Sequence, residues 1–419
     1  MKPLQPGWPV VKNETGENGM DAPHSTAPSP MSMTGSNQTK VRDHNERLVL
    51  HLIRKNGTLT KAEATRAIQL SPNAVSMIFK SLEKDNLLLR GDPLRGRIGQ
   101  PSVPLRLNPD ARYYIGLKIG RRSFELVVVD FCGAVRAHRA RAHAYPTPVS
   151  VRAFIKAEMP ALLRSAGVKR SQISGSGIAM PTGLWLWVDE FDASAQDMQA
   201  WRNFDAQADL PDVLPGPILV ENDATAACRA EWTFGKLADR PDSIYFFVGT
   251  FIGGGIVLNG SVFTGCHGNA GGFGPIRVPD QPGGNRLIDH ASLMALNRML
   301  DASGQHVDPT MFPEGDWNTL EPVLTRWISR ASLSLAHAII STAAVIDFAH
   351  VVIDGPFPET VRTRLCKEVD RQLDNLDLQG IFRPEILCGS FGGTARALGA
   401  AAKHISVRYM IENPLAPLG

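Results

Sequence analysis

The stretch SIYFFVGTFIGGGIVLNGSVF, residues 243–263, decides the fold. It reads as an apolar strand, a glycine turn, a second apolar strand, an Asn-Gly turn and a third strand. Asn-Gly between apolar strands is a strong signal for a tight hairpin turn. The same theme stands earlier, where YYIGLKIGRRSFELVVVDFCGAVRAHRA (113–140) predicts a β-hairpin followed by a third strand. Two such hairpins in one chain predict a duplicated α/β body with a cleft between its halves.

The stretches around these two hairpins predict further strands and helices. GSGIAMPTGLW (175–185) and PILVENDATAACRAEWTFG (217–235) read as strands that lead into loops and a helix. Later in the chain a long apolar helix runs into a strand at Val351–Asp354, and PEILCGSFGGTARALGAAAKH (384–404) reads as strand, glycine loop and helix. We therefore expect residues 111–408 to form one two-lobed α/β body.

A smaller helical module precedes this body, at residues 43–108. A first helix ends at Gly57, and Thr60 with a glutamate three residues later forms the capping box of a second helix. In SPNAVSMIFKSLEKDNLL (71–88), Ser71 suits the N-cap of a third helix, and the proline after it suits the first helical position. A strand, a basic glycine-containing turn and another strand follow. Three short helices and such a hairpin predict a winged helix-turn-helix.

The exposed side of the third helix and the tip of the wing carry the side chains expected to contact DNA. Asparagine and serine can reach base edges, lysine can contact a phosphate, and arginine on a flexible turn suits phosphates or a minor groove. The candidate DNA-binding residues are Ser71, Asn73, Ser76, Lys80, Arg95, Arg97 and Gln100. Residues 41–110 hold twelve lysines and arginines against seven acidic residues, which favours a polyanion as partner. A winged helix that docks a protein is the alternative.

Composition bounds the remaining possibilities. Residues 1–40 are rich in Pro, Ser, Thr, Asn and Gly and predict a disordered arm, with a start site placed too far upstream as the alternative. The N-terminus lacks the apolar core of a secretory signal, and no apolar run approaches the roughly 20 residues that cross a bilayer. The five cysteines are scattered and never spaced as Cys-x-x-Cys. We therefore expect a cytoplasmic protein with no disulfide framework and no membrane partner.

The body also carries four motifs that follow one another along the chain: ENDATAA (221–227), GTFIGGGIVLNG (249–260), GNAGGFG (268–274) and GSFGGTARALGAA (389–401). In this order and spacing they resemble the ROK family of sugar kinases and transcriptional repressors. The winged helix in front, with LSPNAVSMIFKSLEKDNLL and GRIGQPSVPLRLNP, resembles the repressor branch. The resemblance covers about residues 43 to 403 and implies an actin-like, ribonuclease-H-like duplicated fold.

The resemblance implies that the kinase site is altered. Kinases of the family read Asp-x-Gly-Gly-Thr at the first hairpin, where this chain has KIGRRS (118–123). Lys118 stands for the carboxylate, and Arg121 and Arg122 stand for glycine and threonine. A cationic side chain cannot hold magnesium, and bulky arginines obstruct a close phosphate. We therefore expect no ATP-dependent catalysis, no catalytic residue and no cofactor.

The family's zinc and sugar motif is altered as well. The resemblance implies Asn-Ala-Gly-Glu-x-Gly-His and then a cysteine cluster ending in Cys-x-Glu, which together hold zinc and sugar hydroxyls. Here Gly272, Pro275 and Ile288 stand for the glutamate, the histidine and the second glutamate, and the cysteines are missing. The remaining candidate ligands match no zinc spacing, so we expect no metal. These candidates are His267, Asp280, Asp289 and His290.

The residues that remain for a ligand centre on the ENDA motif. In relatives, the positions of Asn222 and Asp223 hold sugar hydroxyls and supply the base. Asn269 and Thr182, which stands in a loop that lines the sugar cleft of relatives, are the further candidates for effector binding. The alternative is that Asn222 and Asp223 only cap the helix that follows them. If a ligand binds, the loss of the selecting glutamate and histidine predicts a hydroxyl preference that is no longer glucose-like.

The sequence thus predicts a DNA-binding transcriptional regulator, a repressor of carbohydrate-related genes. We expect its partners to be a double-stranded DNA operator and a sugar or sugar-phosphate effector, and its assembly to be a homodimer or homotetramer. Two alternatives stay open. One is an active ATP-dependent sugar kinase with an added winged helix, and the other is a constitutive DNA-binding scaffold with a non-functional pocket.

Overall fold

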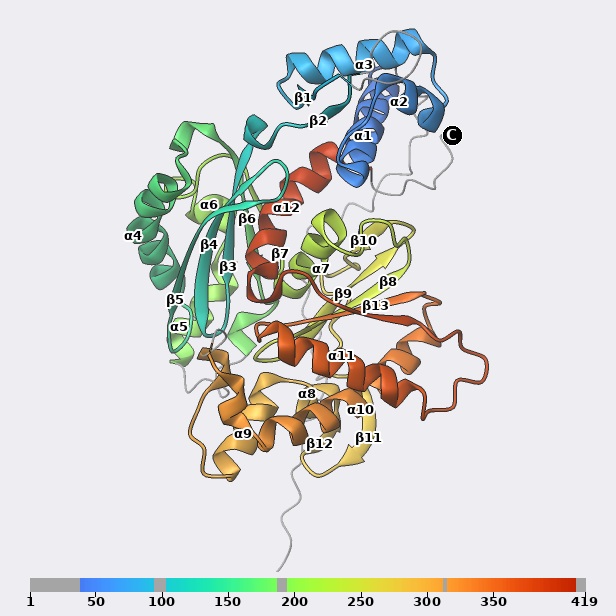
Figure 1. The fold of residues 1–419 in the computed structure, drawn as a ribbon. Helices are drawn as coiled ribbons and strands as arrows, with labels where there is room; N and C mark the ends of the chain where they lie inside the picture. Colours follow the sequence, from blue (N-terminus) through green and yellow to red (C-terminus); the bar gives the residue numbers. More distant parts are fainter. Residues whose placement is uncertain (1–37, 94–102, 187–193, 312–314, 412–419) are drawn as a thin grey trace, which may run out of the picture.

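The computed structural model describes residues 38–93, 103–186, 194–311 and 315–411. Figure 1 shows a small helical module at one end of the molecule and a body whose two lobes are built around separate five-stranded sheets. None of the helices in the described ranges is long and apolar enough to cross a membrane.

The N-terminal module has the elements that the sequence predicted. They are α1 (Gln38–Asn56), α2 (Lys61–Ile68), α3 (Pro72–Lys84), β1 (Leu88–Arg90) and β2 (Leu105–Leu107). The capping box of α2 is present, because the Glu63 amide donates to the Thr60 hydroxyl and the Thr60 amide to the Glu63 carboxylate. Ser71 caps α3, and β1 pairs with β2 in antiparallel fashion as the flanks of a wing. The apolar stripe of α3 is buried in the module's core.

The first helix begins earlier than the sequence predicted. Helix α1 begins at Gln38, inside the range 1–40 expected to be disordered, and residues 1–37 lie outside the described part of the chain. The first two turns of α1 carry no apolar stripe, so periodicity did not reveal them. Polar contacts support them instead, since Arg42 pairs with Glu46 at 3.1 Å and donates to the Ser81 hydroxyl of α3 at 2.8 Å.

The two lobes repeat one sheet topology, which confirms the predicted duplication. The first sheet has the order β5-β4-β3-β6-β7 and the second the order β10-β9-β8-β13-β14. In each, the first three strands in the chain are antiparallel and the last two are added in parallel. The first lobe contains β3 (Tyr113–Ile119), β4 (Ser123–Asp130), β5 (Val135–Ala142), α4 (Pro148–Ala166), β6 (Ile173–Met180), β7 (Ile218–Asn222) and α7 (Asp223–Phe234). The second contains β8 (Ser243–Val248), β9 (Ile252–Leu258), β10 (Ser261–Phe263), α10 (Val323–Ala343), β13 (His350–Asp354), α11 (Glu359–Leu373), β14 (Glu385–Cys388) and α12 (Ala395–Tyr409).

The last helix, α12, ties the lobes together. It follows the second sheet in the chain but packs on β3 and β6 of the first sheet and on α7 (Figure 1). The backbones approach so closely that a Cβ on Gly177 of β6 would lie 1.8 Å from the Ala400 carbonyl oxygen. Glycine is therefore required there to seat the helix on the sheet.

The winged helix is docked on the body rather than held only by a linker. Phe131 and Tyr409 of the body belong to the apolar core of the winged helix, and their rings meet edge-on at 5.0 Å. Arg54 of α1 donates to the Phe131 carbonyl at 2.9 Å and stacks on the rings of Phe131 and Phe234. An ion pair between Lys55 and Asp239 at 2.9 Å lies beside this contact.

Candidate ligand cleft and DNA-reading surface

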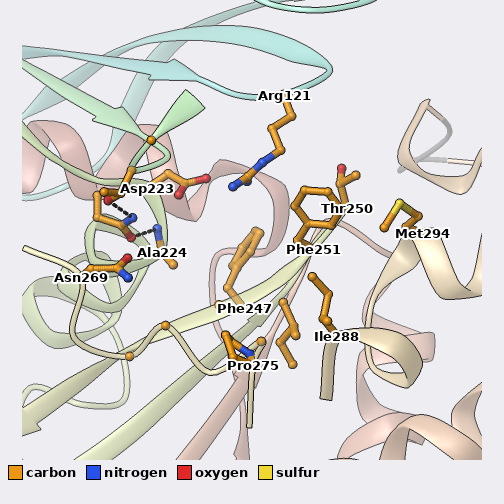
Figure 2. A pocket seen from close by; sticks show the side chains of 18 of the residues that line it. Arg121, Asp223, Ala224, Phe247, Thr250, Phe251, Asn269, Pro275, Ile288 and Met294 are labelled. Carbon is orange, nitrogen blue, oxygen red and sulfur yellow. Dashed lines mark hydrogen bonds between the residues drawn. The ribbon is translucent and has the colours of Figure 1, made fainter. Parts of the chain in front are cut away.

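A cavity of about 530 Å³ lies between the two lobes, and all four residues predicted to bind an effector line it. Thr182 follows β6, Asn222 ends β7, Asp223 begins α7, and Asn269 lies in the loop after β10. Figure 2 shows Asp223 and Asn269 on one side of this space and apolar side chains across from them. The apolar lining includes Phe247, Phe251, Pro275, Ile288 and Met294.

The side chain of Asn222 makes hydrogen bonds within the protein. Its side-chain oxygen accepts the amides of Ala224 at 2.9 Å and Thr225 at 3.2 Å, which caps α7. Its side-chain nitrogen donates to the Thr182 hydroxyl at 3.1 Å. The capping alternative therefore describes Asn222 well, and one amide N–H remains for the cavity.

Asp223 has a different environment. It does not cap α7, it is only 7% exposed, and its Oδ2 lies 3.6 Å from a terminal nitrogen of Arg396 on the first turn of α12. This separation is an ion pair rather than a hydrogen bond. The Arg396 guanidinium also lies over the Phe247 ring, 4.7 Å from its centroid. Sequence reasoning missed Arg396, because GSFGGTAR reads as an ordinary glycine turn that starts a helix.

The altered loop of residues 267–290 supplies part of the apolar lining of the cavity. It contains β11 (Arg277–Gln281), β12 (Gly284–Arg286) and the short helix α8 (Leu287–His290). Gly272, Pro275 and Ile288, which stand for the three side chains implied by the resemblance, all line the cavity. Asn269, Arg286 and Asp289 of the same loop also line the cavity and keep polar groups there.

The candidate metal ligands of this loop have local structural contacts. His290 Nε2 lies 3.0 Å from the Gly284 carbonyl oxygen, and Asp289 accepts a hydrogen bond from Arg286 at 2.8 Å. Across the described ranges, no group of three His, Cys, Asp or Glu side chains is arranged to hold a metal ion.

A second cavity of about 500 Å³ adjoins the first and shares Arg121, Thr250 and Arg396 with it. Lys118 lies buried at its edge, where Nζ donates to the Glu125 carboxylate at 2.7 Å and to the Ser123 hydroxyl at 2.6 Å. Lys118 and Glu125 are directly opposite each other on β3 and β4. A buried ion pair thus occupies the place where the resemblance implies a metal-holding carboxylate.

Burial and charge shift the pKa values around this pair. Burial, followed by the positive charge of Arg396, lowers the pKa of Lys118 to about 8. Burial acts to raise the pKa of Glu125, but Lys118 and its neighbours outweigh it and hold that pKa well below the usual range. Burial, followed by the charge of Lys118, lowers the pKa of His143 to about 4. Nearby positive charge lowers all three pKa values, and burial adds to this effect for Lys118 and His143 but opposes it for Glu125.

The glycine turn before α12 is organised by Asp354, a residue that sequence reasoning did not single out. Asp354 is fully buried at the end of β13 and accepts from the Tyr245 hydroxyl, the Gly392 amide and Arg362, each at 3.1 Å. Gly392 adopts a φ of +55°, which glycine tolerates best. This network fixes the start of α12 beside the second cavity.

The surface of α3 presents most of the predicted DNA contacts together. Asn73 and Lys80 are exposed and Ser76 is half-buried, while the Ser71 hydroxyl accepts the Ala74 amide at 3.3 Å and is therefore partly used as a cap. Met77, which was not among the candidates, is 71% exposed on the same surface. An exposed methionine can pack against a thymine methyl group. The wing candidates Arg95, Arg97 and Gln100 lie outside the described residues.

A winged helix-turn-helix docked on a two-lobed, actin-like body with an interlobe cleft defines the class of this protein. The model of the ROK family matches residues 114–405, and a model described as winged helix-turn-helix DNA-binding matches residues 42–88. The chain therefore belongs to the ROK family.

Similar proteins include both regulators and kinases. A xylose repressor of Bacillus subtilis is 23% identical over 244 residues, which is 58% of this chain and 62% of the repressor. The crystal structure of a ROK family transcriptional regulator, a homologue of the Escherichia coli MLC protein, has a TM-score of 0.64 at 18% identity, over 88% of this chain and 96% of that one. A ROK glucokinase of Streptomyces griseus, solved with glucose and AMPPNP, has a TM-score of 0.54 at 22% identity, over 69% and 98%. The structural likenesses show the shared fold.

Proposed function

We propose that this chain is a sequence-specific DNA-binding transcriptional regulator of carbohydrate-related genes, a repressor whose cleft binds a sugar-like effector. One observation carries the proposal: a single helix, α12, begins at the cleft and ends in the core of the winged helix. The match to a xylose repressor supports a sugar-related regulator.

The contacts of α12 make it a suitable link between a ligand and DNA. Arg396, on its first turn, lines both cavities, and Tyr409, its last residue, packs against Phe131 within the winged-helix core. Between them the helix is fixed closely on α7, since a Cβ on Gly399 would lie 1.6 Å from the Ala226 carbonyl oxygen. A change in lobe angle would therefore move α12 as a rigid unit. The effector shifts DNA binding only if it prefers one of the two arrangements.

We propose further that the cleft does not transfer phosphate. Phosphoryl transfer needs a carboxylate that holds magnesium and a base for the attacking hydroxyl. Lys118, paired with Glu125, stands where the carboxylate that holds magnesium would be. Asp223, the carboxylate at the position of the base, lies beside Arg396. The two carboxylates, Glu125 and Asp223, are thus both engaged by cations from the protein itself.

The proposal extends to assembly and location. A winged helix recognises paired half-sites when two copies are related by symmetry, so we expect a homodimer or homotetramer on a palindromic operator. Such a protein acts where DNA is accessible, which agrees with the reducing cytoplasm expected from the scattered cysteines.

Selection of operator fragments from a random DNA library with the full-length protein provides the test. The expected result is a defined site whose affinity falls about 10-fold with at least one sugar, without any help from ATP and magnesium. ATP turnover on a hexose panel would establish the kinase instead. An operator whose affinity no sugar changes would favour the constitutive scaffold.

A further inference from the structure

We propose that Cys366 and Cys388 form a thiol pair that a peroxide oxidises to a disulfide, which makes them a modification site within the second lobe. The five cysteines are scattered along the chain and unbridged, and the fold brings these two together. Cys366 lies on α11, and Cys388 is the last residue of β14. The disulfide therefore joins a helix to a strand against which it packs.

The packing of α11 on the second sheet places the two sulfur atoms beside each other. Cys366 Sγ lies 4.0 Å from the carbonyl oxygen of Ile353, the residue opposite Cys388 in the register of β13 and β14. Cys388 Sγ lies 4.0 Å from the carbonyl oxygen of Arg362, which stands one helical turn before Cys366 on α11. The Cys366 thiol donates a hydrogen bond to the Cys388 sulfur. Thiols already in contact have only to approach to the S–S bond length of about 2.05 Å.

The two thiols differ in access and in acidity. Cys388 is half-buried on β14, the last strand of its sheet in the described part of the chain, whereas Cys366 is only 4% exposed. Hydrogen bonding from Cys366 lowers the pKa of Cys388; burial opposes this effect, and the positive charges of Lys236 and Arg362 add to it. The same hydrogen bond, followed by burial, raises the pKa of Cys366. Because the thiolate is the nucleophile, Cys388 attacks the oxidant and Cys366 closes the bridge.

The reaction runs in two steps, with hydrogen peroxide as the oxidant. The Cys388 thiolate attacks one peroxide oxygen, so that an S–O bond forms, the O–O bond breaks, and the other oxygen leaves as hydroxide and takes up a proton to give water. The Cys388 sulfur is thereby oxidised by two electrons to a sulfenic acid. The Cys366 sulfur then attacks the sulfenic sulfur; an S–S bond forms, the S–O bond breaks, and the hydroxyl leaves with the Cys366 proton as water. One peroxide thus converts two thiols into one disulfide and two waters.

The bridge acts on the glycine turn from which α12 starts. Gly389, directly after Cys388, donates its amide to a carbonyl of β13 at 2.9 Å. Further along the turn, the Gly392 amide donates to the buried Asp354 carboxylate at 3.1 Å, and Arg362 of α11 donates to the same carboxylate at 3.1 Å. A covalent link between α11 and β14 therefore fastens both flanks of this turn. Local opening of the turn becomes rarer, and its amides exchange with solvent more slowly.

Titration of the reduced full-length protein with hydrogen peroxide, followed by thiol counting and peptide mapping, tests the pair. One equivalent of peroxide should remove two of the five thiols and yield one bridged peptide pair, Cys366 with Cys388, which dithiothreitol separates again. Cys366→Ala should leave the first step intact and prevent the second, so dimedone, which traps sulfenic acids, should label Cys388. Cys266→Ser is the matched control, because Cys266 is an exposed cysteine on another loop. It should form the bridge as the unaltered protein does.

Amide exchange followed by mass spectrometry measures the effect on the turn. Exchange over residues 385–394 should slow in the bridged protein and stay near the reduced level in peroxide-treated Cys366→Ala. Retention of all five thiols, a bridge between other cysteines, or a sulfinic acid on Cys388 without a bridge would overturn the pair. Unchanged exchange in the bridged protein would overturn its effect on the turn. Should Cys366→Ala not fold, the peptide map of the unaltered protein decides the question.

Discussion

Replacing Arg54 with methionine should release the winged helix from the body. Arg54 donates to the carbonyls of Phe131 and Cys132 and stacks on two phenylalanine rings, each 5.4 Å from its guanidinium carbon. Burial, as the first cause, lowers the pKa of Arg54 to about 10, so the side chain stays charged at neutral pH. Methionine keeps much of the length and packing but removes every one of these polar contacts.

The size of the effect follows from these contacts. A hydrogen bond from a charged donor contributes about 1.5–3 kcal/mol, and each cation–π contact about 0.5–2 kcal/mol. Part of this is offset because the buried charge no longer has to be desolvated. We therefore expect Arg54→Met to weaken docking by about 3 kcal/mol. Lys55→Met, one residue away, removes an exposed ion pair with Asp239 and should cost at most about 1 kcal/mol.

Differential scanning calorimetry of the two variants is the assay. Arg54→Met should show two separate transitions, with the smaller one from the winged helix at lower temperature, while Lys55→Met should melt like the unaltered protein. The operator affinity of Arg54→Met should change little, but its response to the effector should be lost. A single unshifted transition for Arg54→Met, or an equal effect of Lys55→Met, would refute the assignment of Arg54 as the anchor.

Three further predictions concern the cleft and the DNA surface. Lys118→Met should destabilise the fold by about 3–5 kcal/mol in urea titrations, because it removes the lysine partner of a buried carboxylate, and adding Glu125→Gln should recover most of the loss. Folding depresses the pKa of Glu125, so this residue stabilises the fold above its ordinary pKa of 4.5, and that stabilisation is lost on acidification. The double variant Lys118→Met, Glu125→Gln should therefore lose less stability than the unaltered protein as the pH falls below 4.5. Asp223→Ala should abolish the effector response and spare operator affinity, and a surviving response would remove Asp223 from the site. Lys80→Ala should weaken binding to all DNA sequences and reduce the salt slope by about 1, which electrophoretic titrations at several salt concentrations can measure.

The fold could be predicted largely from local signals. The Ser71 cap, the capping box at Thr60 and the Asn-Gly turn at Asn259 each depend on residues within a few positions of one another. The two lobes could be predicted to be repeats because each begins with a hairpin of apolar strands joined by a glycine turn. The start of α1 escaped prediction, since its polar first turn has no periodic apolar signal.

The site was predictable only in part. Asp223 and Asn269 could be singled out through the motifs, but Arg396 lies far from Asp223 in the chain and reaches it only because α12 packs back on the first lobe. No local sequence pattern predicts the contact between Arg396 and Asp223. The Lys118–Glu125 pair is different: the two residues stand equally far from the turn of a predicted hairpin, so cross-strand register would have placed them opposite each other.

The most direct test of the link between cleft and DNA is the affinity of the effector for the protein with and without bound operator. Linkage requires that a ligand which weakens operator binding 10-fold must itself bind 10-fold more weakly when the operator is present. We predict equal factors in the two directions for the unaltered protein and a factor near one for Arg54→Met. An effector Kd that is the same with and without operator would contradict the account.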